Sequence, residues 1–371
     1  MEKHLVLAGG GHAHMICLEN LAKFVERGHK VTVIGPSPYH YYSGMGPGML
    51  GGTYTPEEIR FATQQVVENA GGTFVHDTVE GVDPKEKRVL LKSGEAVSYD
   101  VVSFNIGSFV PKTIITEDNG DIYSVKPIEK LLEAKIRVLK IVNTEKSSLV
   151  VVGGGPAAAE VAGNLCQLTQ NAVYRPDITV FSGGPFMERF SDRIQKKTSS
   201  YLKNRGINIK ENTKVASVKT GEVGLATGET VSADIIFMAT GVTPSRVFKK
   251  SSLPTGPDGG LLVNQHLQSV EYPEIFGGGD CIYFKDHPLD KVGVYAVRQN
   301  PVLFHNLMAS LEGTAPTPFD PGGNYLLIFN LGDGIGILKK KWIIFGGRLA
   351  FIIKDYIDVK FIKRFQAIES I

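Results

Sequence analysis

The chain reads Leu5-Val6-Leu7-Ala8-Gly9-Gly10-Gly11-His12-Ala13-His14 near its start, and this stretch decides the fold. An apolar run typical of a buried strand leads directly into three glycines, and a helix-prone segment follows from about His12 to Arg27. Glycine lets the backbone approach a ligand, and a helix N-terminus carries partial positive charge, so this turn is suited to hold a pyrophosphate. A second apolar strand, Lys30–Ile34, completes a βαβ unit.

The same pattern returns further along the chain as Leu149-Val150-Val151-Val152-Gly153-Gly154-Gly155-Pro156-Ala157-Ala158. A helical segment from Ala157 to about Leu168 and a strand over Ile178–Phe181 follow it, as in the first unit. One glycine-rich turn of this kind is weak evidence, because such strand ends are common. Two of them predict two dinucleotides in one protein, and that pairing indicates electron transfer.

Composition narrows the classes of function. The 371 residues include 40 Lys and Arg against 38 Asp and Glu, so no overall field favours nucleic acid as a partner. The three cysteines, Cys17, Cys166 and Cys281, are scattered, which argues against a disulfide scaffold and suits a reducing compartment. The chain enters its first strand by about His4 without a charged leader, and no apolar run is long enough to span a membrane. We therefore expect a cytoplasmic protein.

Apolar periodicity and glycines predict the rest of the chain. A Gly- and Pro-rich loop over Gly35–Gly52 could lie against a flat ligand, because glycine permits close approach. We expect a hairpin from Arg88 to Phe104, with its turn near Ser93-Gly94. Helices are expected over Ile128–Ile141 and Tyr295–Leu311. An apolar run extends from Ile235 to Gly241, and a linker is expected over Pro316–Gly323.

Two further motifs, Ala239-Thr240-Gly241 and Gly278-Gly279-Asp280, follow the two glycine turns along the chain. In this order and spacing the chain resembles the two-dinucleotide FAD/NAD(P) oxidoreductases over essentially its whole length. The resemblance implies an α/β fold with two Rossmann-like domains, an FAD-binding domain split by an inserted NAD(P)-binding domain, and a C-terminal amphipathic segment. The implied boundaries are 1–112 and 243–323 for the FAD-binding domain, 113–242 for the NAD(P)-binding domain with its leading helix, and 324–371 for the C-terminal segment.

In that family the first turn binds FAD, the second binds NAD(P)H as co-substrate, and the aspartate of the Gly-Asp motif holds the ribityl chain. The N-terminal N–H groups of the late helix would face the flavin pyrimidine oxygen and stabilise the reduced ring. The resemblance thus implies these cofactor-binding residues: Gly9, Gly11, His12, Ala13, Ser43, Val79, Gly107, Gly153, Gly155, Ser182, Gly241, Asp280, Gly293, Val294 and Tyr295.

Several positions depart from the family pattern. His14 and Ala158 stand at the third glycine of the two turns, and His14 demands more space between helix and strand. The acidic residue that usually ends the second strand is absent, because Gly35 follows Ile34 and Ser182 follows Phe181. His12 and His14 suggest a metal pair, but no further ligands accompany them. We therefore expect phosphate contact or packing there, and no metal.

The chain is similar in its start to the flavoprotein modules of selenide, water dikinases, and in its C-terminal part to type II NADH:quinone dehydrogenases and sulfide:quinone oxidoreductases. The loop from Tyr39 to Gly52 holds no cysteine, so disulfide reduction lacks its dithiol. Gly154 and Ile328 stand where sulfide:quinone oxidoreductases carry redox cysteines, which disfavours that chemistry. Cys166 and Cys17 are expected to pack in the core, while Cys281 could approach the flavin.

The remaining chemistry is transfer of hydride from NAD(P)H to FAD and then to an acceptor that needs no thiol. Glu160 matches a carboxylate of the type II dehydrogenases near the flavin, although a first-turn helix glutamate can also be structural. Gln299, beside Arg298, resembles the glutamines of quinone sites. Tyr41 and Tyr42 are equally compatible with core packing and with stacking on the flavin.

The C-terminal segment predicts contact with a membrane surface. It offers Leu349, Ile352, Ile353, Tyr356, Ile357 and Phe361 as an apolar surface, preceded by Trp342. Eight basic residues, Lys339, Lys340, Lys341, Arg348, Lys354, Lys360, Lys363 and Arg364, oppose only Asp355 and Asp358. Such a segment suits the anionic inner face of a membrane. Packing on the FAD-binding domain, or a homodimer interface, is the alternative.

We therefore expect an NAD(P)H:quinone oxidoreductase attached peripherally to the inner face of the membrane. The alternatives are a sulfide- or selenium-linked flavin oxidoreductase and an FAD-binding redox-sensing or electron-coupling subunit.

Overall fold

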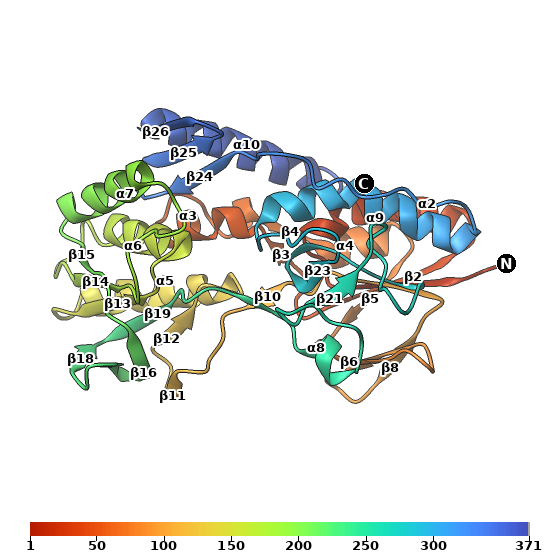
Figure 1. Cartoon of the computed structure of the whole chain (residues 1–371), viewed down its shortest axis with the longest axis horizontal. Coiled ribbons are helices and arrows are strands. Elements are labelled where there is room, and N and C mark those ends of the chain that lie inside the picture. Colours follow the sequence, from red (N-terminus) through yellow and green to blue (C-terminus); the bar gives the residue numbers. More distant parts are fainter. Residues whose placement is uncertain (370–371) are drawn as a thin grey trace.

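The computed structural model describes residues 1–369 and contains two parallel five-stranded sheets (Figure 1). The strands of the first sheet are β1 (His4–Ala8), β2 (Lys30–Gly35), β5 (Thr73–His76), β9 (Val101–Phe104) and β22 (Ile275–Gly277). Those of the second are β12 (Ile122–Ser124), β13 (Ser148–Val152), β14 (Asp177–Phe181), β15 (Asn208–Lys210) and β19 (Ile235–Met238). Their orders are β22-β9-β1-β2-β5 and β12-β19-β13-β14-β15. The predicted α/β fold with two dinucleotide-binding domains is confirmed.

The second sheet is inserted into the first along the chain. The chain forms β1, β2, β5 and β9, builds the whole second sheet, and then returns to add β22 beside β9. The outgoing and returning segments lie side by side, because β10 (Ser108–Phe109) pairs antiparallel with β20 (Thr243–Pro244). The turns that follow β9 and β19 therefore lie close to the boundary between the two sheets.

The first βαβ unit differs from the prediction in its helix. In place of one helix from His12 to Arg27, the structure has a 3₁₀ turn and two short helices, η1 (His12–His14), α1 (Met15–Glu19) and α2 (Leu21–Glu26). Asn20 interrupts the helix, since its side-chain Nδ2 donates to the carbonyl of Ile16 and its backbone leaves the helical region. Competition of this kind between side chain and backbone is typical of asparagine.

The predicted hairpin from Arg88 to Phe104 is correct only in its first part. β7 (Arg88–Leu91) and β8 (Ala96–Ser98) form an antiparallel hairpin, but β9 leaves it and joins the first sheet parallel to β1. All four residues of β9 are buried. A continuous buried run is typical of a central parallel strand, which is the reason for the difference.

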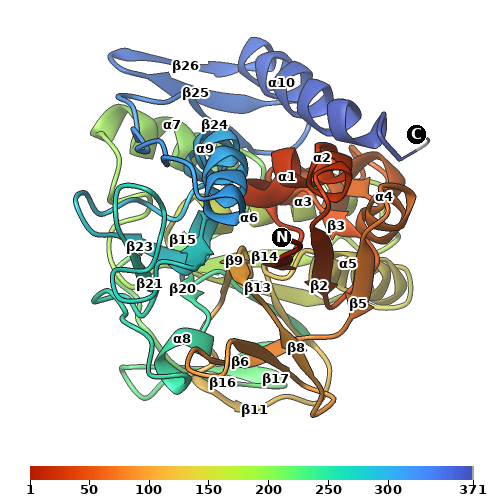
Figure 2. The same ribbon diagram turned by 90° about the vertical axis from the view of Figure 1, so that its right-hand side faces the viewer.

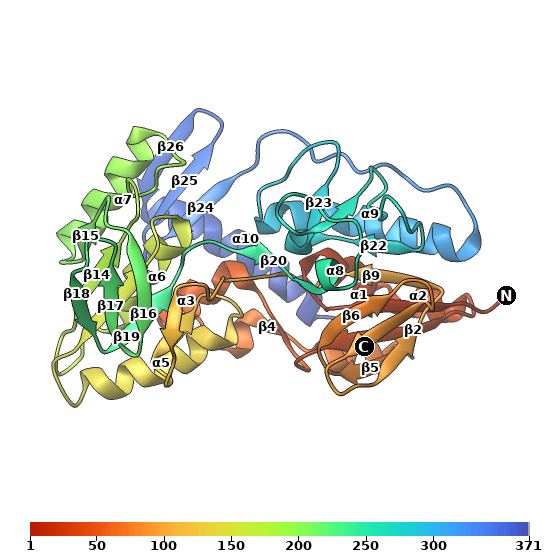
Figure 3. The same cartoon turned by 60° about the horizontal axis from the view of Figure 1, so that its bottom comes forward.

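The second unit follows its prediction closely. Helix α6 (Pro156–Leu168) starts at the second glycine turn, and α5 (Glu129–Val142) precedes β13. In the returning part, α9 (Gly293–Glu312) begins two residues before the predicted helix. Figure 3 shows α9 in the half of the molecule that holds the first sheet, and α5 with α7 (Asp192–Asn204) in the other half.

Antiparallel sheets and short elements complete the two halves. The remaining elements before residue 324 are β3 (His40–Tyr41), η2 (Ser43–Met45), α3 (Gly46–Leu50), η3 (Glu57–Ile59), β4 (Arg60–Phe61), α4 (Thr63–Asn69), β6 (Val79–Asp83), β11 (Ile115–Glu117), β16 (Val215–Lys219), β17 (Gly221–Leu225), β18 (Thr230–Ala233), α8 (Val247–Lys250), β21 (Leu261–Val263), η4 (Gly279–Cys281) and β23 (Ile282–Phe284). The sheet β6-β7-β8 belongs to the first half, and β11-β16-β17-β18 belongs to the second.

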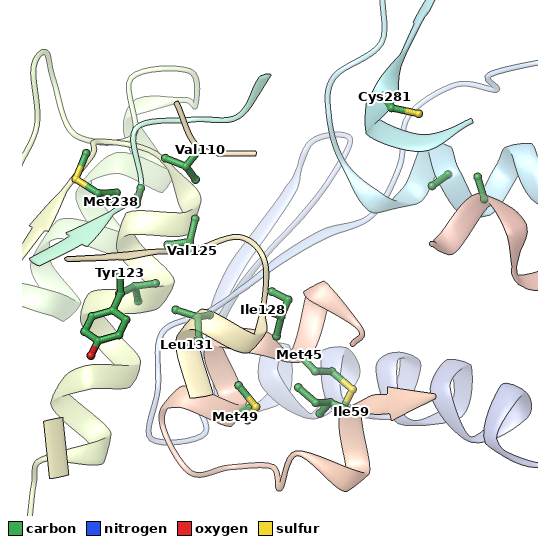
Figure 4. Close-up of a cluster of buried hydrophobic side chains, with 14 of the residues drawn as sticks. Met45, Met49, Ile59, Val110, Tyr123, Val125, Ile128, Leu131, Met238 and Cys281 are labelled. Carbon is green, nitrogen blue, oxygen red and sulfur yellow. The ribbon is translucent and has the colours of Figure 1, made fainter. Parts of the chain in front are cut away.

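A buried cluster joins the glycine-rich loop to the second half. Figure 4 shows Met45 and Met49, at the end of η2 and in α3, lying near Ile128 and Leu131 at the start of α5. A Cβ atom added to Gly46 would lie 2.8 Å from Ile128 Cδ1, so a side chain there would displace that of Ile128 and glycine favours this approach of α3 to α5. The loop predicted to lie against a flat ligand is thus held in place by packing.

The C-terminal segment covers one side of both halves. Strands β24 (Leu327–Asn330), β25 (Gly336–Lys340) and β26 (Ile343–Gly347) form an antiparallel sheet, and α10 (Arg348–Gln366) packs against it and against β4 (Figure 2). The last two residues of the predicted segment, 370–371, lie outside the described residues. No helix within residues 1–369 combines the length and the apolar character needed to cross a bilayer.

Candidate functional site

The first glycine turn is closed tightly by the loop after β9. Gly9 has φ +92°, and its N–H donates to the carbonyl of Ile34 at 2.8 Å. A Cβ atom on Gly9 would lie 2.3 Å from the Asn105 carbonyl oxygen, and one on Gly11 would lie 2.7 Å from Asn105 Oδ1. Gly9 therefore requires glycine, both for its backbone conformation and for its closeness to the Asn105 backbone, whereas a side chain at Gly11 would displace the Asn105 side chain.

His14 is placed in the space that its side chain requires. Its side chain is fully buried, with Nδ1 2.6 Å from the Gly9 carbonyl oxygen and Nε2 2.8 Å from Ser103 Oγ. Burial lowers the pKa of His14 to about 4, so the ring is neutral. A neutral ring donates from Nδ1 to Gly9 and accepts from Ser103. The histidine at the third glycine position thus ties the turn to β9.

The second glycine turn leaves an open space where a ligand would lie. Gly153 has φ +149°, and a Cβ atom there would lie 2.1 Å from the Ala239 carbonyl oxygen. A Cβ atom on Gly154 would lie 2.0 Å from Ser182 Oγ, which packs beneath the turn. Gly155, at the N-cap of the 13-residue helix α6, has no atom within 4 Å of its Cβ position. Close packing behind the turn and open space before it fit a dinucleotide pyrophosphate.

Asp280 is held as a carboxylate by two side chains. Lys126 Nζ lies 2.6 Å from Asp280 Oδ2, and Ser108 Oγ donates to the same oxygen at 2.8 Å. Burial disfavours the charged form, but the ammonium of Lys126 outweighs it and lowers the pKa of Asp280. A carboxylate at this position fits the hydroxyl groups of a ribityl chain, because an ionised carboxylate only accepts hydrogen bonds.

Helix α9 supports both the first turn and the Gly-Asp motif. Gln299 is fully buried, and its Oε1 accepts from the Gly279 N–H at 2.7 Å. Asn300 Oδ1 accepts from the Ile16 N–H at 2.9 Å. Gln299 therefore holds the motif that carries Asp280, a contact that the sequence-based interpretation as a quinone ligand did not foresee. At the start of α9, Gly293 is open on its Cβ side.

Aromatic rings lie between the first turn and α10. The ring centroid of His12 is 5.1 Å from that of His40, 4.9 Å from Tyr42 and 6.0 Å from Phe361. Burial lowers the pKa of His12 to about 3 and that of His40 to about 4, so both rings are neutral. Tyr41 pairs with Arg60 between β3 and β4. Tyr42, rather than Tyr41, joins the cluster beside the turn.

Glu160 is half-buried on α6, against the C-terminal sheet. Its Oε1 accepts from the Asn330 N–H at 2.8 Å. Burial raises the pKa of Glu160 to about 7, although the charge of Lys354 and the bond from Asn330 act against this shift. A carboxyl group with such a pKa can hold or release a proton near neutral pH, which is the property of a general acid or base.

Lys354 and Asp358 connect α10 to the Gly- and Pro-rich loop over Gly35–Gly52. Lys354 Nζ lies 2.5 Å from Asp358 Oδ2 and donates to the Gly44 carbonyl oxygen at 2.8 Å. Tyr42 OH donates to Asp358 Oδ1 at 3.1 Å. Burial, followed by the charge of Asp358, raises the pKa of Tyr42, so its phenol stays protonated. The sequence-based analysis assigned Lys354 to a basic surface, and this was wrong, because the side chain is buried and paired.

The structure places the other predicted cofactor residues as follows. Ala13 is buried within η1, and Ser43 begins η2 directly after Tyr42. Val79 is the first residue of β6 and lies in the antiparallel sheet, paired with Leu91. Gly107 and Gly241 follow β9 and β19, with φ +67° and +96° and open Cβ positions. Val294 and Tyr295 lie in the first turn of α9, after Gly293.

The cysteines are all buried and unbonded to one another. Burial raises the pKa of Cys281 to about 11, and its Sγ contacts the carbonyl oxygens of Phe104 and Gly278 at 3.4 and 3.3 Å. Burial likewise raises the pKa of Cys17. A thiol needs its thiolate form to act as a nucleophile, so these two side chains are arranged for packing.

Comparison with known proteins agrees with this geometry. A sequence model of the family described as pyridine nucleotide-disulphide oxidoreductase matches residues 3–306. The chain is 25% identical over 390 residues to a type II NADH:quinone oxidoreductase from Staphylococcus saprophyticus, covering 96% of this chain and 94% of the relative.

Two solved structures share the fold at low sequence identity. The first is NDH2 from Plasmodium falciparum in complex with NADH, with a TM-score of 0.82, 14% identity, and coverage of 100% of this chain and 97% of that one. The second is the sulfide:quinone oxidoreductase from Aquifex aeolicus, with a TM-score of 0.79, 18% identity, and coverage of 99% and 92%. With the family match over most of its length, the chain is an oxidoreductase that belongs to the pyridine nucleotide-disulphide oxidoreductase family.

Proposed function

We propose that the protein is an FAD-dependent NAD(P)H:quinone oxidoreductase. Gly9, Gly11 and Asp280 would hold FAD, and Gly153 and Gly155 would hold the nicotinamide nucleotide. The strand order supports an FAD-binding domain of residues 1–112 and 243–323 around an NAD(P)-binding domain of residues 113–242. When bound, FAD would supply the chemistry of accepting a hydride and passing two electrons to the acceptor.

A single observation carries the proposal, namely the half-buried, readily protonated Glu160. Reduction of a quinone to a quinol consumes two protons along with two electrons, so the site needs a proton donor sheltered from water. Asn330 occupies Oε1 of Glu160, which leaves Oε2 to hold the proton. With a pKa of about 7, this carboxyl group can release a proton and regain one at neutral pH.

The buried groups on α10 support the same function. Lys354 acts on Glu160 through its charge, and it joins Gly44 of the Gly35–Gly52 loop to Asp358. Tyr42 joins the same hydrogen-bonded group, because its hydroxyl donates to Asp358 Oδ1. These residues would hold α10 against the loop and provide a second set of exchangeable protons beside the aromatic cluster. The geometry favours an acceptor that enters from the α10 side.

The surface of α10 and its hairpin supports attachment to the inner face of a membrane. Trp342 is 82% exposed, at the β25–β26 turn, and the apolar side chains exposed with it are Ile343, Leu349, Ile352, Tyr356 and Ile357. Ala350, Ile362 and Phe365 are buried on the other side of α10. The helix thus packs on the protein with one face and presents apolar and basic groups with the other. A quinone dissolved in the bilayer would then reach the site directly, and a second copy of the chain is the alternative occupant of this surface.

Anaerobic stopped-flow absorbance tests the proposal. NADH, NADPH and sulfide are mixed in turn with the FAD-loaded protein, and a water-soluble quinone is then added. We expect rapid bleaching by NADH or NADPH and recovery of colour with the quinone. Bleaching by sulfide alone would favour a sulfide-linked enzyme, and slow bleaching by every donor would favour a redox-sensing subunit. A protein that stays colourless with FAD would contradict the whole proposal.

A further inference from the structure

A cleft of about 830 Å³ opens between the two halves of the molecule, away from α10. Its walls come from β10, β12, the start of α5 and α8, which Figure 1 shows around the crossing between the sheets. No residue of either glycine turn, Gly9–Gly11 or Gly153–Gly155, is among those that line it. The cleft is therefore distinct from the two glycine turns.

The cleft has an excess of positive charge. Five cationic side chains line it, namely Lys112, Lys126, Lys130, Arg246 and Lys250, against the carboxylates of Asp118 and Glu133. Two of the cations are paired with these carboxylates, at 3.9 Å for Lys112–Asp118 and 2.6 Å for Lys130–Glu133. In the part of the chain that the structure describes, Arg246 and Lys250 have no carboxylate within salt-bridge distance. Two uncompensated cations on α8 favour an anionic ligand.

The other walls are apolar, so the charges stand beside surfaces that suit an organic group. Phe109, Val110, Ile122 and Pro127 line this part of the cleft. The guanidinium of Arg246 lies 6.0 Å from the ring centroid of Phe109, and a planar group could stack beside them. A volume of this size exceeds the need of inorganic phosphate and lies in the range of sites for small organic ligands.

Lys126 connects the cleft to the flavin-binding candidates. It lines the cleft, yet its Nζ is bonded to Asp280 at 2.6 Å and to Ser108 at 3.1 Å. Its side chain keeps 27% exposure, so an anion in the cleft can reach the ammonium. Such an anion would compete with Asp280 for the same charge.

From these observations we infer that the cleft binds a nucleotide di- or triphosphate. Its phosphates would meet Arg246, Lys250 and Lys126, and its base would lie against the apolar wall at Phe109. The structure thereby assigns to this protein a regulatory nucleotide site, distinct from the two glycine turns and linked to the flavin-binding candidates through Lys126. Binding there would draw Lys126 from Asp280. This last consequence rests on the proposed function, whereas binding itself does not.

Isothermal titration calorimetry tests the binding on the full-length, FAD-loaded protein. ATP is titrated at constant ionic strength into the wild type, into Arg246→Gln/Lys250→Gln, and into the control Lys249→Gln, a neighbour on α8 that does not line the cleft. We expect the double substitution to weaken ATP binding at least tenfold, and Lys249→Gln to leave it unchanged. Absence of ATP binding by the wild type, or equal binding by all three proteins, would overturn the inference, since ATP would then bind nowhere or at the glycine turns.

A second titration tests the link to Asp280. FAD affinity of the apoprotein is measured by quenching of flavin fluorescence with and without saturating ATP. We expect ATP to weaken FAD binding severalfold in the wild type and to have no such effect in Arg246→Gln/Lys250→Gln. If ATP binds with the expected dependence on α8 but FAD affinity does not change, the competition for Lys126 is wrong. Failure of FAD to bind at all contradicts the proposed function, and the same ATP titrations on the protein without FAD then decide the binding inference by themselves.

Discussion

Lys354 Nζ lies 2.5 Å from Asp358 Oδ2, one turn apart on α10, and both side chains are buried. Charged pairs at this spacing are usually exposed on helix surfaces, where they contribute little to stability. Here the lysine also donates to the carbonyl of Gly44, and the aspartate accepts from Tyr42. The pair therefore ties α10 to the loop that follows the first βαβ unit, far away in sequence.

Breaking this pair is expected to destabilise the protein strongly. Lys354→Met leaves Asp358 buried without its counter-ion, which costs about 3–5 kcal/mol in comparable buried pairs. Replacing both residues, as Lys354→Met/Asp358→Leu, removes the two charges together and is expected to cost less than the single change. Urea unfolding at pH 7 measures the free energies of unfolding. A single substitution that costs under 1 kcal/mol would show that the pair does not hold α10 in place.

The stability of the protein is expected to depend on pH through Glu160. The pKa of Glu160 is about 7 in the folded protein, against an ordinary value of 4.5. The folded state therefore keeps the proton up to a higher pH than the unfolded state does. The stabilisation is fully present below pH 4.5, is lost as the pH rises to about 7, and amounts to about 3 kcal/mol by linkage.

Glu160→Gln is expected to remove this part of the pH dependence and to slow quinone reduction while FAD stays bound. Urea unfolding between pH 5 and 8, together with the rate of quinone reduction, checks both effects. The matched control is Glu145→Gln, because Glu145 is exposed in the segment that follows α5. Equal pH profiles for the wild type and Glu160→Gln would remove the proton-donor role from Glu160.

His14 is expected to support FAD binding through the shape of the first turn. His14→Ala removes the bonds to Gly9 and Ser103 and leaves a buried hydroxyl without its partner, at a cost of about 2–4 kcal/mol. The same change frees the Gly9 carbonyl, so we expect weaker FAD binding in the fraction that still folds. Thermal unfolding of the apoprotein and flavin fluorescence measure the two effects separately. His76→Ala, at an exposed histidine, serves as the control.

The two sheets could be predicted because their signals are local. In β1 and β13, apolar runs lead into glycines that the structure places against Asn105 and Ala239, so sequence and packing agree residue by residue. The buried pair on α10 could not be predicted, because the sequence pattern around Lys354 and Asp358 is that of ordinary helix-surface charges. Their burial depends on the loop that contains Gly44, which is distant in the sequence and packs on them. The bond between Gln299 and Gly279 could not be predicted for a similar reason, because the order of residues does not reveal that α9 packs against this loop.

Membrane binding is expected to depend on the exposed apolar side chains of the C-terminal segment. Trp342→Ser/Ile352→Ser removes two of them without touching the buried face of α10, so we expect less protein to co-sediment with anionic liposomes. Ile136→Ser is the control, because Ile136 is 66% exposed on α5, in the other half of the molecule. Undiminished binding by the double variant, with wild-type sedimentation of the control, would contradict membrane contact through this surface.

Gly153 and Gly155 are expected to respond in opposite ways to the same substitution. Gly153→Ala places a Cβ atom 2.1 Å from the Ala239 carbonyl oxygen at φ +149°, so the protein itself should be destabilised. Gly155→Ala meets no protein atom within 4 Å, so stability should change little while the new methyl group enters the space left for the pyrophosphate. We therefore expect Gly155→Ala to weaken NADH binding at least tenfold with an unchanged unfolding temperature, measured by fluorescence titration and calorimetry. Because this turn is open only on the side that faces the nucleotide, normal NADH affinity in Gly155→Ala would mean that the nucleotide binds elsewhere.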